Sequence, residues 1–291
     1  MPLITESTFR VRHYECDAYG HVNHANYLRY MQEAAFESSA AAGYDVARYQ
    51  AMDRLWYVHE SDITYLRPLT YGDSVKVKTW VSNFSRIRCR RSYELFNSSS
   101  NELVAQAITG WVYLDGSTLR PAAIPQEVLS AYWPDGAPDE IPPRERIPKA
   151  PPPPPGVFTM RRPVRWRDID GAGHVNNASY LAYIEDCGVE VGKAHGWTMK
   201  RMMEAGFGII ARRYRIEYLL PAFLDDELEI STYVSDPRRA TAVRHYTIKR
   251  AGDGALLARA HVLWVWVDLD SGRPMRIPSN FMEEYADNIV R

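Results

Sequence analysis

The amino-acid sequence predicts an α+β protein made of two similar domains, each a curved antiparallel sheet wrapped on one long helix. Two observations lead to this prediction. The chain repeats itself at a constant spacing of 153 residues, and each copy contains one helical pattern followed by four long strand patterns. With 291 residues, the chain is also long enough for two domains of ordinary size.

The repeat keeps one register between residues 11 and 125 of the first copy and requires no insertion. Chance does not preserve an offset over such a length, so we interpret the sequence as a duplication. The matched pairs include Asp17 and Asp170, His21 and His174, Asn23 and Asn176, Tyr27 and Tyr180, Tyr65 and Tyr218, Asp73 and Asp226, Arg86 and Arg239, Tyr93 and Tyr246, Trp111 and Trp264, and Asp115 and Asp268.

A proline-rich segment separates the two copies and ends in five consecutive prolines, residues 151–155. Proline fixes φ and lacks a backbone donor, so this segment cannot be helix or central strand and tends to be extended. We therefore predict a first domain over residues 1–133, a semi-rigid linker over 134–158, and a second domain over 159–291. We expect the linker to have no role in recognition.

The elements of one copy follow from its hydrophobic spacing. Residues 7–14 predict a short strand, and a glycine-containing loop then leads to a helix over 26–42, where apolar and small residues recur every three or four positions. Gly43 is a suitable helix stop. Four further strands are expected, and the second copy repeats the same layout. These strands cover residues 54–66, 74–81, 87–96 and 102–114.

Composition and charge exclude several classes of protein. Hydrophobic residues make up 46% of the chain and charged residues 24%, which is a globular composition. The formal net charge is -1, so no nucleic-acid partner is expected. The segment MPLITESTFR has no apolar core of the secretory type, and no apolar stretch is long enough to span a bilayer, so we expect no membrane partner. Three widely spaced cysteines favour a reducing compartment, and we expect a cytoplasmic protein.

A motif in each copy joins the first predicted strand to the helix. Residues 15–27 read ECDAYGHVNHANY, and residues 168–180 read DIDGAGHVNNASY. The first motif resembles the signature of the 4-hydroxybenzoyl-CoA thioesterase family, whose members have the hot-dog fold. That signature has an acidic residue, any residue, an aspartate, a glycine-containing loop, and an aromatic ten residues after the aspartate. The motif of the other copy resembles more closely the plant-type acyl-ACP thioesterases, which are also tandem hot-dog proteins.

The resemblance implies which residues are catalytic. The family aspartate falls on Asp17 in the first copy and on Asp170 in the second. The loop histidine of the acyl-CoA members falls on His24, and the histidine of the acyl-ACP members falls on His174. The second copy has Asn177 in place of His24.

Each copy also departs from the resembling families. The acyl-ACP enzymes have an asparagine two residues after the catalytic aspartate, where this chain has Tyr19 and Ala172. Neither copy therefore matches one subfamily completely, and the carrier of the acyl group stays open between CoA and ACP. The resemblance further implies that one tandem chain supplies its own domain pair as an intrachain pseudo-dimer. Further assembly into homo-oligomers of such pseudo-dimers stays open too.

The chemistry of thioester hydrolysis supports the same residues. A carboxylate can take a proton from water, an effect worth roughly 10²–10⁴ in rate, or it can attack the thioester directly. Backbone N–H groups at a helix N-terminus can stabilise the developing oxyanion. Gly20 and Gly173 allow a substrate to approach the backbone closely. The sequence contains no metal-ligand spacing and no glycine-rich nucleotide loop, so we predict no metal and no cofactor.

Simpler explanations exist for most of these residues. Asp17 and Asp170 could be turn residues, because aspartate favours turns. We expect Asn23 and Asn176, just before the helix, to be N-caps rather than chemical groups. Glu33 is more plausibly on a solvated helix face than near the loop.

Arginines are concentrated beside one predicted strand. Arg86, Arg88 and Arg90 alternate, so we expect them on one face of the strand, where a guanidinium suits a phosphate. In the resembling CoA thioesterases, basic residues near this strand contact the CoA phosphates. The second copy has Arg238, Arg239 and Arg244 in this region. The alternative is a sheet edge protected by charge.

The sequence therefore predicts an acyl-CoA thioesterase that uses Asp17 and Asp170 as base or nucleophile. An acyl-ACP thioesterase is the first alternative. Another hot-dog enzyme, such as a hydratase or dehydratase acting on acyl thioesters, is the second, although no matching Asp/His motif occurs. A non-catalytic protein that binds acyl thioesters is the third; it would not need an aspartate in both loops.

Overall fold

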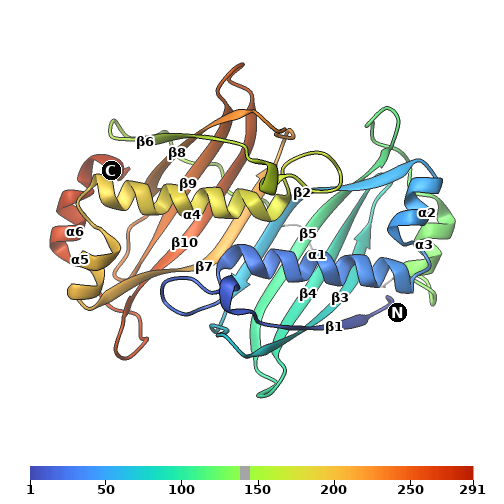
Figure 1. The fold of residues 1–291 in the computed structure, drawn as a ribbon, viewed down its shortest axis with the longest axis horizontal. Coiled ribbons are helices and arrows are strands. Elements are labelled where there is room, and N and C mark those ends of the chain that lie inside the picture. The colour runs from blue at the N-terminus through green and yellow to red at the C-terminus, as the bar shows by residue number, and fades with distance from the viewer. Residues whose placement is uncertain (138–144, 291) are drawn as a thin grey trace. The chain divides into compact units, whose positions relative to one another are not determined.

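The computed structural model describes residues 1–137 and 145–290, and the chain divides into two compact units, Met1–Arg146 and Ile147–Arg291. Residues 138–144 of the predicted linker lie outside the described residues. Each unit contains one long helix that lies across one face of an antiparallel sheet (Figure 1). Each unit is therefore α+β as predicted. The same arrangement in both units confirms the duplication.

Unit 1 begins with strand β1 and a 3-10 turn η1, and continues with helices α1 and α2, strands β2 to β5 and helix α3. Its strands are ordered β1-β3-β4-β5-β2, and every neighbouring pair is antiparallel. The bounds are β1 Thr5–Arg10, η1 His13–Glu15, α1 His24–Ala41, α2 Val46–Ala51, β2 Arg54–Tyr65, β3 Ser74–Phe84, β4 Arg88–Asn97, β5 Leu103–Asp115 and α3 Gln126–Tyr132.

Unit 2 repeats this order, with strands ordered β6-β8-β9-β10-β7. It has one addition near the C-terminus, a 3-10 turn η3. The bounds are β6 Phe158–Pro163, η2 Trp166–Asp168, α4 Asn177–Ala194, α5 Met199–Glu204, β7 Phe207–Tyr218, β8 Glu227–Ser235, β9 Thr241–Arg250, β10 Leu256–Asp268, α6 Ser279–Glu284 and η3 Ala286–Asn288.

Most predicted elements of the first copy occur in the structure. The long helix and the four long strands are confirmed, with ends that shift by at most three residues. The predicted first strand lies too late in the chain: β1 ends at Arg10, and the 3-10 turn η1 occupies His13–Glu15. The short helices α2 and α3 are absent from the prediction, because six or seven residues contain too few turns to show a helical period.

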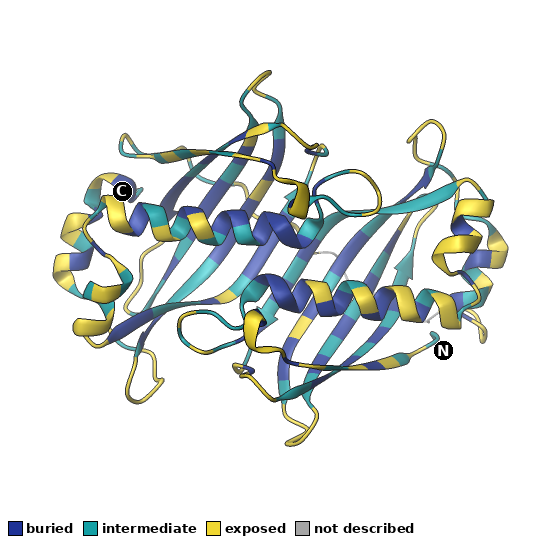
Figure 2. Cartoon of the chain, viewed as in Figure 1, coloured by how far each residue is buried: buried dark blue, intermediate teal, exposed yellow. Residues whose placement is uncertain are grey.

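Helix α1 packs closely on the sheet because its inner face is made of small residues. Ala34, Ala35 and Ser38 are at most 4% exposed. The facing strand β3 alternates buried and partly buried residues, with Val75, Val77 and others turned inward. Figure 2 shows buried and exposed residues alternating along each long helix. The helix and sheet thus form the layer that positions the loop before the helix.

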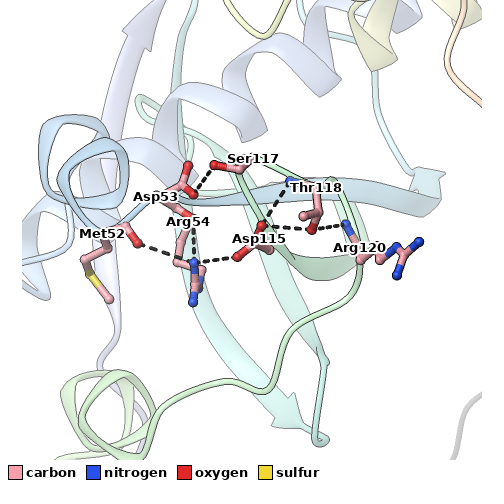
Figure 3. Close-up of polar contacts among 7 residues, drawn as sticks. All are labelled: Met52, Asp53, Arg54, Asp115, Ser117, Thr118 and Arg120. Atoms are coloured by element: carbon pink, nitrogen blue, oxygen red, sulfur yellow. Dashed lines mark hydrogen bonds and ion pairs between the residues drawn. The ribbon is translucent and has the colours of Figure 1, made fainter.

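A polar network closes the far turn of unit 1 (Figure 3). The Asp115 carboxylate accepts from the Thr118 backbone N–H at 3.0 Å and from Arg54 Nη1 at 3.0 Å, and hydrogen bonding to Thr118 lowers the pKa of Asp115. Arg54 also donates to the Asp53 carbonyl at 2.7 Å. The Asp115–Asp268 match in the repeat is thus explained structurally, since Asp268 accepts from the Ser271 N–H at 2.8 Å.

Candidate functional site

The motif loop of unit 1 is a short closed turn between η1 and helix α1. Cys16 pairs with Val22 as an isolated antiparallel bridge, and Val22 N donates to the Leu69 carbonyl at 2.7 Å. Gly20, with a φ of 77°, makes the reversal, and its N–H donates to the Asp17 carbonyl at 3.0 Å. The turn therefore has a defined shape before any side chain is considered.

The first acid of the motif, Glu15, is structural. Glu15 is 6% exposed and accepts from Arg12 N at 2.7 Å and from Tyr30 Oη, on helix α1, at 2.6 Å. Burial, together with the hydrogen bond to Glu15, raises the pKa of Tyr30, so its phenol stays protonated and keeps donating. The Glu15 carbonyl also accepts from Asn23 N at 2.9 Å. Glu15 thus ties both ends of the loop to the helix.

Asp168 has the same position in unit 2. It is 7% exposed, and its carboxylate accepts from Arg165 N at 3.0 Å. Its carbonyl accepts from Asn176 N at 2.8 Å. Sequence reasoning recognised this acid only as part of a signature; its burial and its bonds show that it anchors the loop.

Asp17 lies two residues further on, at the mouth of the turn. Its Oδ1 accepts from the backbone N–H groups of Tyr19 at 2.9 Å and of His21 at 3.2 Å. Its own N–H donates to the His21 carbonyl at 2.8 Å. Asp17 is therefore a turn residue, which agrees with the alternative explanation given for it from the sequence. The same bonds also fix the direction of its carboxylate.

Asp170 repeats this geometry and is linked to the helix. Its Oδ1 accepts from Ala172 N at 2.9 Å, and its Oδ2 accepts from Asn176 Nδ2 at 3.2 Å. The Asn176 Oδ1 in turn accepts from Ala178 N at 2.9 Å, in the first turn of α4. The carboxylate is thereby coupled through one side chain to the N-terminal amides of the helix.

Asn23 has the corresponding role in unit 1. Its side chain accepts from Ala25 N at 3.0 Å, and it is the N-cap of helix α1. Asn176 is the N-cap of α4. The prediction that both asparagines are N-caps is confirmed. Each helix therefore begins immediately after the motif turn, and in unit 2 the cap residue also donates to the turn aspartate.

His24 is the first residue of helix α1, and its ring packs edge-on against Tyr65, with centroids 4.9 Å apart. Tyr65 Oη donates to the His24 carbonyl at 3.3 Å. In unit 2, Tyr218 Oη donates to the Asn177 carbonyl at 3.1 Å. The tyrosine of β2 or β7 thus contacts the start of the helix in both units. The repeat marked this tyrosine, but sequence reasoning gave it no role.

His174 lies inside the turn rather than on the helix. Its Nδ1 donates to the Val175 carbonyl at 3.1 Å, and its Nε2 is buried. Its backbone carbonyl accepts from Asp170 N at 3.1 Å. His174 and Asp170 therefore belong to one turn, whereas His24 reaches the site from the helix.

The predicted arginine face is only partly correct. Strand β4 begins at Arg88, so Arg86 lies outside it, in the turn after β3, where its carbonyl accepts from Ile124 N at 2.9 Å. Arg88 and Arg90 do share one face of β4, because Cys89 and Arg91 between and after them are buried on the other. The turn ends the strand alternation that placed Arg86 with them.

Two other arginines of the region face the core. Arg91 is 4% exposed, and its guanidinium lies 5.5 Å from the centre of the Tyr132 ring. Arg244 is 8% exposed and donates to Asn288 Oδ1 at 3.2 Å. Arg244 is thus removed from the set of arginines able to meet a phosphate.

A basic hollow of about 470 Å³ lies at the β8–β9 turn of unit 2. Arg238, Arg239 and Arg276 line it together with Ile277 and with Met282 and Glu283 of helix α6. Arg238 and Arg239 appeared in the sequence only as remnants of the first copy's arginines, and Arg276 gave no signal because it comes from a distant segment.

Helix α4 separates this hollow from the Asp170 turn. The turn precedes the N-terminus of α4, while Trp197, just after its C-terminus, packs on Phe281 of α6 with centroids 5.2 Å apart. A helix of 18 residues is about 27 Å long. The Asp170 turn and the basic hollow therefore lie near opposite ends of α4.

We also searched the described residues for groups of metal ligands and for helices able to span a membrane. Among the residues that the structure describes, no three His, Cys, Asp or Glu side chains are grouped as metal ligands. Within the same residues, none of the helices is both long and apolar enough to cross a lipid bilayer. Glu33 is exposed on helix α1, as expected for a solvated face.

Comparison with known proteins agrees with this geometry. The family described as Acyl-ACP thioesterase N-terminal domain matches residues 2–132, and the Thioesterase-like superfamily matches residues 164–285. The 12:0-ACP thioesterase of Umbellularia californica has a similar fold, with a TM-score of 0.71, 20% identity, and coverage of 90% of this chain and 93% of that one. For an acyl-ACP thioesterase of Bacteroides thetaiotaomicron the TM-score is 0.70, at 18% identity, with 90% and 97% covered.

Sequence relatives give the same result. The acyl-CoA thioester hydrolase YbgC of Escherichia coli is 34% identical over 128 residues, which are 43% of this chain and 95% of the relative. The chloroplastic palmitoyl-acyl carrier protein thioesterase of Gossypium hirsutum is 24% identical over 279 residues, or 90% of this chain and 64% of the relative. A chloroplastic acyl-ACP hydrolase of Cuphea viscosissima is 26% identical over 62% of this chain, which spans only 46% of that relative.

The two repeated units, with a turn aspartate before the capped helix of each, define a tandem hot-dog protein. The chain belongs to the thioesterase family that includes the 4-hydroxybenzoyl-CoA-type and acyl-ACP thioesterases. The first copy carries the His-Ala-Asn-Tyr ending of the acyl-CoA members, yet it is the copy that the acyl-ACP family matches.

Proposed function

We propose that the chain hydrolyses acyl thioesters, with Asp17 and Asp170 as the reactive carboxylates. The observation that carries the proposal is the repeated turn, in which backbone N–H groups orient an aspartate directly before a capped helix N-terminus. A fixed carboxylate beside backbone donors is the arrangement that acyl transfer requires. Membership of the thioesterase family supports the same reaction class.

The reaction needs one bond made and one broken at the acyl carbon. In the general-base route, the carboxylate takes a proton from water, the hydroxyl adds to the carbonyl carbon, and the thiolate leaves and takes up the proton. In the nucleophilic route, the carboxylate itself displaces the thiolate and water then hydrolyses the anhydride. In both routes, N–H groups of the first helix turn stabilise the oxyanion.

The histidines have separate proposed roles. His174, which belongs to the same turn as Asp170, is the proposed proton carrier between the attacking water and the leaving thiolate. His24 orients the substrate carbonyl from the first position of helix α1. Asn177 replaces it in unit 2 and can hold a hydrogen bond but cannot move a proton near neutral pH.

The test is thiol release from a panel of acyl-CoA and acyl-ACP substrates. The double variant Asp17→Asn/Asp170→Asn should keep the turn, because an amide oxygen accepts the same backbone bonds, and should lose at least ~10² in kcat. The matched control is Asp45→Asn, which changes an aspartate that caps helix α2 and accepts from Arg48 N at 2.8 Å. Normal turnover in the folded double variant would refute the catalytic aspartates.

The carrier that we propose is CoA, with Arg88 and Arg90 near its phosphates and Arg86 in the adjoining turn. Charge removal at these three positions should raise KM for acyl-CoA and leave kcat unchanged, because contacts far from the reacting carbon stabilise ground state and transition state alike. The salt dependence of KM should also weaken. An unchanged KM would return the three arginines to the role of a charged sheet edge.

An acyl-ACP substrate is the second candidate, and a specific observation favours it. The acyl-ACP thioesterase family matches residues 2–132, and the Gossypium hirsutum relative aligns over 90% of this chain. The acyl-ACP candidate would be favoured by a kcat/KM for acyl-ACP that exceeds the value for acyl-CoA carrying the same acyl group. Hydration of crotonyl-CoA without hydrolysis would support the hydratase alternative, and substrate bound without turnover would support a binding protein.

A further inference from the structure

An exposed apolar surface lies beside the Asp170 turn of unit 2. Five large side chains form it: Trp166, which is 79% exposed, and Leu219, Leu220, Phe223 and Leu224, which are 47%, 48%, 46% and 39% exposed. The last four come from the loop between β7 and β8. Single exposed apolar residues need no explanation, but a continuous group of this size on one loop marks an interaction surface.

Unit 1 shows that this surface is not required by the fold. The equivalent loop has the same backbone bonds: Val22 N donates to Leu69 O at 2.7 Å in unit 1, and Val175 N donates to Ala222 O at 2.9 Å in unit 2. The equivalent side chains are more polar. Leu220, Phe223 and Leu224 of unit 2 correspond to Arg67, Thr70 and Tyr71 of unit 1.

The repeat places the fifth side chain, Trp166, beside the loop. In unit 1, the rings of His13 and Tyr71 meet edge-on with centroids 5.5 Å apart. Their counterparts in unit 2 are Trp166 and Leu224, which the repeat brings to the same place. The backbone bond that fixes this neighbourhood is also shared, since Val164 N donates to Asp226 O at 2.8 Å. Trp166 therefore extends the apolar loop.

The charges around this surface favour an anionic partner. Arg165 and Arg167 flank Trp166, both are exposed, and neither guanidinium forms an ion pair within the described part of the chain. Two nearby acids are neutralised: Asp226 by Arg250 at 3.0 Å, and Glu227 by Arg161 at 3.5 Å. The exposed acid that remains in the loop is Asp225.

We propose that unit 2 docks on an anionic lipid bilayer through Trp166 and the β7–β8 loop. Tryptophan, phenylalanine and leucine enter the interface between headgroups and acyl chains, and arginines beside them meet the lipid phosphates. The expectation of no membrane partner depended on the absence of a spanning segment, and peripheral docking needs none. Because Ala222 of this loop is bonded to Val175, docking brings the Asp170 turn to the lipid surface.

The experiment is sedimentation of the full chain with vesicles of phosphatidylcholine mixed with phosphatidylglycerol, and with vesicles of phosphatidylcholine alone. The test variant is Leu220→Ser/Phe223→Thr/Leu224→Ser, which removes the exposed apolar side chains of the loop and adds no charge. We expect its partition onto the mixed vesicles to fall at least ~10-fold. Arg165→Gln and Arg167→Gln should each cost roughly fivefold, on the mixed vesicles only.

The matched control is Tyr71→Ala, which removes the exposed ring of the unit 1 loop and should leave vesicle binding unchanged. The idea fails if the wild-type chain stays in the supernatant with mixed vesicles, or if the triple variant binds them as well as wild type. A change in sedimentation coefficient without lipid binding would instead assign the surface to a second copy of the chain. Turnover of a short-chain acyl-CoA, measured separately, distinguishes these outcomes from failure of the proposed activity.

Discussion

The two copies of the motif share one backbone and differ in what surrounds it. In both copies, an aspartate accepts the backbone bonds of the turn and a buried acid holds the turn in place. In both, an asparagine caps the helix that follows. In unit 1, the helix starts with His24 beside a polar loop; in unit 2, it starts with Asn177 beside an apolar loop. The shared bonds define the turn, and the differences mark where the two copies of the motif have diverged.

The largest expected effect concerns the two aspartates taken singly. Because His24 can donate or move a proton and Asn177 cannot, we expect Asp17→Asn to remove most acyl-CoA turnover and Asp170→Asn to remove little. The measurement is kcat on one good acyl-CoA substrate for both variants. Equal halving by each variant would show two equivalent sites, and loss confined to Asp170→Asn would reverse the assignment.

The next prediction separates the two acids of one motif. Glu15→Gln should destabilise unit 1 by about 1–3 kcal/mol, because an amide cannot serve all the donors of the buried carboxylate: Arg12 N and Tyr30 Oη meet Oε2, and Arg12 Nη1 meets Oε1. Asp17→Asn, two residues away, should change stability little. Urea unfolding of both variants tests this. If Asp17→Asn were the more destabilising of the two, the structural and chemical roles would have to be exchanged.

A smaller effect is expected at the helix caps. Loss of the cap in Asn23→Ala and in Asn176→Ala should cost about 1 kcal/mol each. Asn176→Ala should also alter turnover at the neighbouring aspartate, because Asn176 Nδ2 donates to Asp170 Oδ2 at 3.2 Å. Kinetics of each variant in the background of the other unit's Asp→Asn change measures this. Restoration by Asn176→Ser of stability but not of turnover would show that the amide donor matters.

The last prediction concerns acid stability, which should differ between the units. His245 and His261 face each other across β9 and β10, and burial lowers the pKa of each to about 4. Ser235 and Tyr233 contact His245, while Arg215, Arg259 and Glu217 influence His261. The unit 1 counterparts, Ser92 and Ile108, do not titrate.

The sign follows from linkage. A histidine with a lowered pKa in the folded state binds fewer protons than in the unfolded chain, so its stabilising contribution is complete above about pH 6.5 and is lost as the pH falls toward 4. His245→Ser/His261→Ile should make the urea midpoint of unit 2 less dependent on pH between 6.5 and 4. An unchanged slope between pH 6.5 and 4 would show that the pair does not control acid stability.

Local sequence determined much of this protein by itself. The constant offset revealed the duplication, and apolar spacing located the long helix and four long strands of the first copy to within three residues. Asn23 and Asn176 were identifiable as caps because capping involves neighbours only two residues away. The turn at Asp17 was readable for the same reason, since its partners lie within four residues.

Tertiary structure decided what depends on distant segments. Glu15 meets Tyr30 only after the helix packs on the sheet, so its burial could not be read from the motif. Arg86 does not share the predicted face with Arg88 and Arg90, because the β3–β4 turn ends the strand alternation before it. His245 and His261 became neighbours through strand pairing, and Arg276 joined Arg238 and Arg239 through the packing of α6. Sequence patterns record local periodicity and hydrogen bonding, whereas these contacts arise from the register and packing of remote elements.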